Sequence, residues 1–262
     1  MTDAPPLPKP RPVPRIELRH VAKAFDGKPV LTDVSLAVGR GESLVIIGGS
    51  GTGKSVTLKC ILGIERPDAG EIRIDGVPAA RVDRRAMLRH FGMLFQGGAL
   101  FDSLPVWRNV AFRLLEARRP MSPRAAHALA VAKLARVGLG PEVADLYPAE
   151  LSGGMQKRVG LARAIATDPD LIFFDEPTTG LDPIMAGVIN DLIRELVTEM
   201  GATAVTITHD MTTVRTVADR VAMLHGGKVR WEGPVAEIET CGDPYVDQFI
   251  HGRATGPIAA IR

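Results

Sequence analysis

The sequence is poor in cysteine and has no long apolar run, and these absences exclude several classes of protein. Cys60 and Cys241 are the only cysteines, too few for a disulfide framework or a four-cysteine zinc site. No run of 18 or more apolar residues is present, so the sequence predicts no membrane-spanning helix. The first residues lack the apolar core of a signal peptide. We therefore expect a globular protein of a reducing cytosol.

The charge is nearly balanced, with a formal net value of +2 over 262 residues. So small an excess disfavours nucleic acid as the main partner. The chain is long enough to bury a sizeable core as one large domain or two small ones. Residues 1–14 differ from the rest because prolines recur there. Since proline fixes φ and lacks an N–H, we expect a disordered tail there, either simply solvated or bound to a partner.

The remaining chain alternates short apolar runs with helical patterns. We expect strands at residues 16–18, 31–38, 43–47, 71–75, 91–95, 171–174, 204–208, 221–224 and 228–231. We expect helices at residues 54–62, 125–137, 152–167, 184–200 and 211–218. This alternation predicts a mainly parallel α/β sheet covered on both faces, with a small antiparallel layer beside it. Residues 97–165 are mostly helical in composition and predict an inserted lobe.

The fourth helix pattern among these, residues 184–200, carries an apolar residue at every fourth position. The positions are Ile184, Val188, Leu192, Leu196 and Met200. Apolar residues at this spacing favour a helix over residues 184–200.

A glycine-rich segment fits the phosphate-binding pattern G-x-x-x-x-G-K-[ST] in full. It comprises Gly48, Gly49, Ser50, Gly51, Thr52, Gly53, Lys54 and Ser55. Glycines let backbone N–H groups turn toward phosphate oxygens, and the following helix points its N-terminus at the same charge. Lys54 would bind the β- and γ-phosphates, and the Ser55 hydroxyl would bind Mg²⁺. The segment predicts binding of a nucleoside triphosphate.

Two carboxylates follow the apolar run at residues 171–174. Asp175 suits Mg²⁺, a hard cation that keeps several of its waters. Glu176 is the best candidate to polarise an attacking water. Taken alone, the pair could equally be the start of a turn before Pro177.

The segment Leu-Ser-Gly-Gly-Met at residues 151–155 is the most informative in the chain. Ser152, Gly153 and Gly154 open a helix and so form a second anion site. Together with the phosphate loop and the acidic pair, this segment resembles the ATPase subunits of ABC transporters, over roughly residues 15–240. The resemblance implies a RecA-like P-loop NTPase fold. It also implies that ATP is sandwiched between two chains packed head to tail, most simply a C2 homodimer.

The same resemblance implies roles for four further residues. Gln96 would contact Mg²⁺ and the attacking water, and His209 would contact the γ-phosphate. Phe25 would stack on adenine, unless it is a plain core residue, and Asp182 would communicate across the dimer. Met155 departs from the family's usual glutamine, but the serine and glycines that bind phosphate are intact.

Three segments are similar to the Mla-type ATPases of phospholipid transport: residues 95–104, 151–158 and 247–252. That resemblance implies an inner-membrane permease, an MCE lipid-binding protein and, in some relatives, a small STAS-like subunit. It places the chain at the cytoplasmic face of the inner membrane. An importer of amino acids or metals is the alternative. A soluble ABC ATPase of DNA repair or translation is disfavoured because coiled-coil and zinc insertions are missing.

The final segment, residues 241–262, predicts a short helix with one apolar stripe. Tyr245, Val246, Phe249 and Ile250 share a helical face, and Gly252 offers a stop. So short a helix must dock on something. We expect it to cross onto the partner ATPase, with docking on its own subunit as the alternative.

Overall fold

The computed structural model describes residues 13–83 and 90–259. The predicted disordered tail, residues 1–14, therefore lies almost wholly outside the described residues. Among the residues described, no helix has the length and apolar character needed to cross a bilayer.

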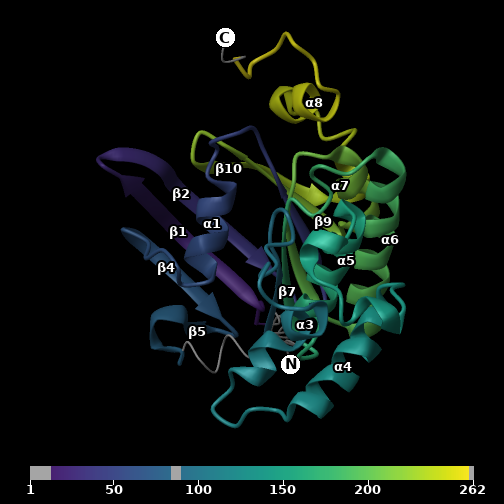
Figure 1. Ribbon diagram of the computed structural model, residues 1–262. Helices are drawn as coiled ribbons and strands as arrows, with labels where there is room; N and C mark the ends of the chain where they lie inside the picture. Colours follow the sequence, from purple (N-terminus) through teal and green to yellow (C-terminus); the bar gives the residue numbers. More distant parts are fainter. Residues whose placement is uncertain (1–12, 84–89, 260–262) are drawn as a thin grey trace, which may run out of the picture.

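One ten-stranded sheet organises the molecule (Figure 1). Its strands are β1 Ile16–Phe25, β2 Lys28–Val38, β3 Ser43–Ile47, β4 Ala69–Ile74, β5 Val77–Pro78, β6 Phe91–Leu94, β7 Leu171–Asp175, β8 Thr203–Ile207, β9 Arg220–His225 and β10 Lys228–Pro234. Their order is β5-β4-β1-β2-β10-β9-β3-β8-β7-β6. The strands β6, β7, β8, β3 and β9 pair in parallel, while β5, β4, β1 and β2 pair antiparallel. The predicted fold class is confirmed.

The parallel half is covered on both faces, which is why its strands read as continuous apolar runs. All five residues of β3 are buried. Helix α1 (Lys54–Ile61) lies on the face that also packs against the antiparallel layer. Helices α5 (Gly153–Ala164), α6 (Pro183–Met200) and α7 (Met211–Val217) cover the opposite face (Figure 1).

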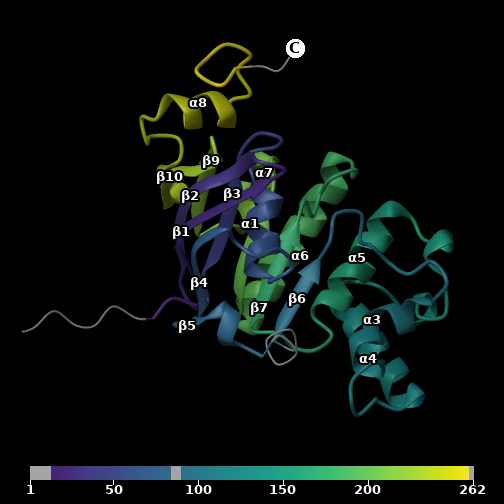
Figure 2. The same ribbon diagram turned by 90° about the vertical axis from the view of Figure 1, so that its left-hand side faces the viewer.

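The helical part of residues 97–165 consists of α3 (Val106–Leu115), α4 (Pro123–Arg136) and α5. It lies on the far side of the parallel sheet from β1, β2 and β4 (Figure 2). Short 3₁₀ turns at Pro141–Val143 and Pro148–Glu150 carry the chain from α4 to α5.

The helix predicted at residues 184–200 is confirmed as α6, but the apolar residues spaced by four do not form its buried face. Ile184 is 80% exposed, and of those five residues only Leu196 is buried. The buried face of α6 consists of Ala186, Ile189, Asn190, Ile193, Leu196 and Val197. An α-helix turns through about 100° per residue, so positions spaced by four drift by about 40° at each step. A buried face needs the mixed spacing of three and four.

Strand β1 is also longer than predicted, ten residues instead of three. Irregular register with β2 and β4 lets it continue through polar residues such as His20, which has a φ of 49°. Bulges of this kind carry no apolar alternation, so pattern alone misses them.

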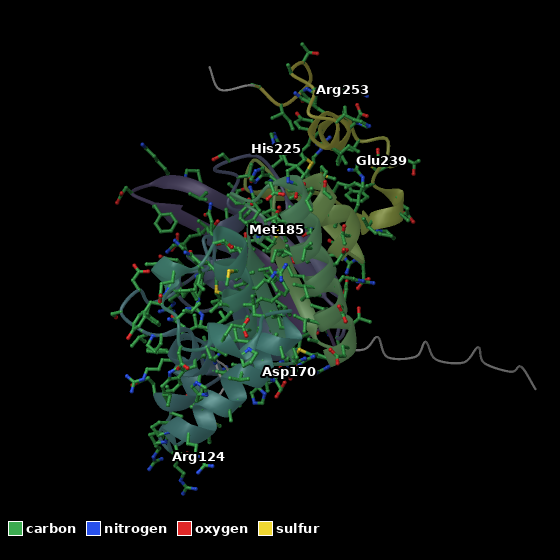
Figure 3. The ribbon with its side chains drawn as sticks, turned by 45° about the vertical axis from the view of Figure 1, so that its right-hand side comes forward. Arg124, Asp170, Met185, His225, Glu239 and Arg253 are labelled. Atoms are coloured by element: carbon green, nitrogen blue, oxygen red, sulfur yellow. The ribbon has the colours of Figure 1, made fainter. Side chains whose placement is uncertain are left out.

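The tail forms α8 (Pro244–Ile250), capped by the Asp243 carboxylate. Val246 is 0% exposed and Ile250 7% exposed, both in the core cluster of their own chain. The Tyr245 ring lies 4.7 Å from that of His225, which is labelled below α8 in Figure 3. Part of the predicted stripe thus docks on its own subunit, and crossing onto a partner stays a prediction.

Candidate functional site

The candidate residues gather at the carboxyl edge of the parallel strands. Leu94 pairs with Phe174, and Asp175 pairs with Ile207. Because β6, β7 and β8 are parallel neighbours, the segments that follow them emerge at one edge of the sheet. Gln96, Glu176 and His209 lie in those segments, and the phosphate loop follows β3 on the other side of β8.

At two positions of the phosphate loop, close packing leaves room only for glycine. A Cβ on Gly48 would lie 2.5 Å from the Leu224 carbonyl oxygen, and one on Gly53 would lie 2.4 Å from Leu31 Cδ2. Both glycines have positive φ, 150° and 100°. The loop is therefore wedged between β9 and β2 and leaves Ser50, Gly51 and Ser55 exposed. Thr52 Oγ1 donates to the Gly49 carbonyl at 2.9 Å.

Lys54 is 9% exposed and lies inside this loop. Its Nζ donates to the carbonyl oxygens of Gly48 at 2.6 Å and Gly49 at 2.9 Å. Burial lowers the pKa of the Lys54 ammonium, and the carboxylates of Glu176 and Asp175 oppose that shift. The amine is thus in place to exchange two carbonyl contacts for phosphate oxygens.

Asp175 is half-buried at the end of β7. Burial raises the pKa of its carboxyl, with repulsion from Glu176 adding to the effect. Within the described ranges no side chain or backbone N–H donates to this carboxylate, so its oxygens remain available. Together with the exposed Ser55 hydroxyl and the exposed Gln96 amide, it offers the hard oxygen donors that suit Mg²⁺.

Glu176 and His209 are brought into direct contact. Glu176 Oε1 lies 2.9 Å from His209 Nδ1, and Glu176 Oε2 accepts from the hydroxyls of Thr179 and Thr208, each at 3.3 Å. The Glu176 side chain is 14% exposed, whereas that of His209 is 65% exposed. Glu176 also has a φ of 48°, which non-glycine residues rarely adopt. The acidic pair is therefore more than an ordinary turn before proline.

Sequence reasoning missed a polar network behind this contact. Asp210 Oδ2 accepts from the hydroxyls of Thr213 at 2.9 Å and Thr178 at 3.2 Å, and Asp210 Oδ1 accepts from Thr212 N at 2.9 Å. Burial alone would raise the pKa of Asp210, but these hydrogen bonds outweigh it and hold the pKa below its usual value. The Asp-x-Thr-Thr run after His209 is a helix-capping signal that could have indicated part of the network.

Sequence reasoning also missed Lys157, a buried lysine on α5. Its Nζ donates to the Glu176 carbonyl at 3.4 Å. Burial lowers its pKa, against the attraction of Glu176 and Asp175. The available signal was spacing, since Lys157 shares a helical face with Gly154 and Leu161, which are buried.

The signature residues, Ser152, Gly153 and Gly154, lie at the start of α5. Ser152 caps the helix, its Oγ accepting from Met155 N at 3.3 Å. Ser152 and Gly153 are exposed, while Gly154 is buried. A Cβ on Gly154 would lie 2.7 Å from Cε of Met185, the α6 residue labelled in Figure 3.

Two candidate residues make contacts within their own chain. Asp182 caps α6, with Oδ1 accepting from the backbone N of Ile184 and Met185, both at 3.0 Å. Phe25 ends β1 at the hairpin turn and is 38% exposed, so it is not a core residue. Lys23 Nζ lies 5.2 Å from the centre of the Phe25 ring. Stacking on adenine and communication across a dimer stay predictions.

A wedged phosphate loop and an acidic pair at the edge of a parallel sheet define a P-loop nucleoside triphosphatase. A family model described as "ABC transporter" matches residues 31–179. The chain belongs to the ABC transporter family, and it is an ATP-binding, ATP-hydrolysing subunit.

Known relatives cover nearly the whole chain. The intermembrane phospholipid transport ATP-binding protein MlaF of Escherichia coli is 42% identical over 93% of this chain and 91% of its own length. The probable ribonucleotide transport ATP-binding protein mkl of Mycobacterium tuberculosis is 39% identical over 93% of this chain and 68% of its own length. A dimeric ATP-binding cassette in a post-hydrolysis state, bound to ADP and Pi, matches with a TM-score of 0.76 and 32% identity, covering 84% of this chain and 98% of that one.

Proposed function

We propose that this chain powers a transporter that moves phospholipids between the inner and outer membranes. The observation that carries the proposal is the 42% identity with E. coli MlaF over nearly the full length of both chains. The relative named for ribonucleotide transport is less similar and is matched over a smaller part of its length. Ribonucleotides are therefore the rival substrate.

The residues at the carboxyl edge of the parallel strands suit ATP hydrolysis. The loop at residues 48–55 holds the phosphates, and Lys54 offsets their charge. Glu176 accepts a proton from the attacking water while the bond from the γ-phosphorus to the bridging oxygen breaks and ADP leaves. His209, in contact with Glu176, orients that carboxylate, and it would contact the γ-phosphate of bound ATP. Ser55, Asp175 and Gln96 would hold Mg²⁺, which neutralises phosphate charge when bound.

The exposed Ser152 and Gly153 at the start of α5 favour a second nucleotide-bearing chain. We propose a head-to-tail homodimer in which Ser152, Gly153 and Gly154 meet the ATP held by the other chain, with Asp182 at the shared boundary. The similarity to a dimeric cassette supports this arrangement.

The transporter partners would be an integral-membrane permease, an MCE lipid-binding protein and a STAS-like subunit, at the cytoplasmic face of the inner membrane. The loop after β6 offers an apolar surface for the permease. Phe95 is 40% and Phe101 43% exposed, and the Phe101 ring lies 4.5 Å from that of Phe112. An exposed aromatic group of this kind marks a contact surface.

The test is transport by the complex purified from membranes of the native host. Reconstituted with labelled phospholipid, the parent complex should move lipid in an ATP-dependent manner, and a complex carrying Glu176→Gln should not. Labelled ribonucleotide provides the second arm. ATP-dependent movement of ribonucleotide without movement of phospholipid would overturn the proposal.

A further inference from the structure

One side chain joins the signature helix to the candidate catalytic base of the same chain. Lys157 lies one turn into α5, the helix that begins with the signature glycines. It is 4% exposed, and its Nζ donates to the Glu176 carbonyl oxygen at 3.4 Å. A buried lysine is costly unless its charge is compensated, and Glu176 and Asp175 both lie within electrostatic reach of it.

The backbone of Glu176 is held from both sides. Its N–H donates to the Ile207 carbonyl of β8 at 2.9 Å, and its carbonyl accepts from Lys157 on α5. Between these bonds Glu176 keeps a φ of 48°. An uncommon backbone conformation persists where the surroundings over-determine it, and here it sets the direction in which the carboxylate leaves the chain.

We propose that Lys157 is a positioning residue for Glu176, tying the signature helix to the peptide of the base within one chain. The proposal rests on the role of Glu176 in the proposed function. In a head-to-tail dimer, the N-terminus of α5 would meet the partner's nucleotide while Lys157 on the same helix holds Glu176 over the chain's own nucleotide. A single helix would then touch both sites.

The first test compares Lys157→Met, Lys157→Arg and a control, Arg158→Met, in the purified complex. Arg158 is the next residue on α5, and its Nη1 donates to the Gly138 carbonyl at 3.3 Å, away from Glu176. Lys157→Met should lower kcat on the order of tenfold to a hundredfold and leave KM for ATP within about twofold, because a misplaced base slows chemistry without weakening binding. Affinity for a non-hydrolysable ATP analogue should stay at the parental level. Lys157→Arg should recover much of kcat because guanidinium can also donate to a carbonyl, and Arg158→Met should resemble the parent.

The second test asks in which site Lys157 acts. Heterodimers are purified through two different tags, and one chain carries Glu176→Gln, so that only the other chain's Glu176 hydrolyses ATP. Lys157→Met placed in the chain with intact Glu176 should abolish most of the remaining activity. The same substitution in the Glu176→Gln chain, whose signature faces the working site, should cost little.

Three outcomes would overturn the proposal: an unchanged kcat in Lys157→Met, an equal effect from both placements, or loss of analogue binding and thermal stability in Lys157→Met with no recovery in Lys157→Arg. Failure of the role that the proposed function gives to Glu176 appears differently. In that case Glu176→Gln itself would leave hydrolysis intact, whatever residue stands at position 157.

Discussion

The phosphate loop and the signature segment are both helix starts proposed to bind phosphate, yet the chain packs them in opposite ways. Gly48 and Gly53 in the loop are wedged against β9 and β2, and Lys54 is buried among the loop's own carbonyls. Ser152 and Gly153 in the signature are exposed, and only the helix cap occupies Ser152 Oγ. The first site is completed by its own chain.

This difference indicates where the second half of the proposed ATP site would come from. The loop is held by contacts within its own chain, whereas an outward-facing helix start becomes useful only when another molecule brings phosphate to it. The fold thus divides the work between an internal half-site and one that is offered to a partner.

The largest effect should come from the internal half-site. Lys54→Ala should lower both ATP binding and hydrolysis. Glu176→Gln should keep binding and slow hydrolysis by about a hundredfold or more, because glutamine cannot accept the proton. With Mg-ATP, sedimentation should show Glu176→Gln accumulating as a dimer. Glu195→Gln, an equally conservative change at an exposed position of α6, is the control. Parental turnover in Glu176→Gln would remove Glu176 from its assigned role.

The contribution of the signature to turnover should be separable from its contribution to the helix cap. Ser152→Ala should lose the helix cap, at a cost of about 1 kcal/mol, together with the partner's phosphate contact. Ser122→Ala is the matched control, since Ser122 Oγ caps α4 by accepting from Ala125 N at the same 3.3 Å but lies far from any phosphate loop in sequence. We expect Ser122→Ala to match the loss of stability without the loss of turnover.

A mixture of Lys54→Ala and Ser152→Ala chains should then regain activity that neither homodimer has. The heterodimer contains one composite site with both defects and one with neither. Verified heterodimers that stay as inactive as their parents would contradict the division between own-chain and partner halves.

Much of this comparison was predictable from the sequence because its signals are local. The spacing of glycines before Lys54 and the serine-glycine start of α5 each fit within eight residues. Apolar runs such as 43–47 predicted the buried parallel strands, and the alternation of strands with helices predicted the sheet they form.

What escaped prediction depends on residues that only the folded chain brings together. Lys157 meets Glu176 across 19 positions, and Thr178 meets Asp210 across 32. Neither contact leaves a periodic trace in the sequence. The buried face of α6 escaped for another reason, because a row of apolar residues spaced strictly by four drifts around the helix.

The C-terminal helix α8 extends the comparison. Part of it is buried within its own chain, as the phosphate loop is, and is not exposed like the signature. Val246 is 0% exposed in its own chain, so Val246→Ala should lower the free energy of unfolding of the monomer by about 1–3 kcal/mol. Val13→Ala, at a position 56% exposed, should change it by less than about 0.5 kcal/mol. Denaturant unfolding under monomeric conditions measures both. A stable monomer with a weakened dimer would instead place α8 on the partner.

The smallest effect concerns the network that supports His209 and Glu176. Hydrogen bonds hold the pKa of Asp210 below its usual value, so its ionised form stabilises the folded state. That contribution is fully present above the unfolded pKa, about 3.9, and is lost as pH falls through the lower folded pKa. Asp210→Asn keeps a competent helix cap but cannot ionise. The difference in unfolding midpoint between parent and variant should therefore be constant from pH 7 to about pH 5 and shrink as pH falls toward 3. Urea unfolding of both proteins across this range measures the difference, and the effects of other carboxylates cancel in the subtraction. A difference that stayed flat down to pH 3 would show that the Asp210 charge does not support the network.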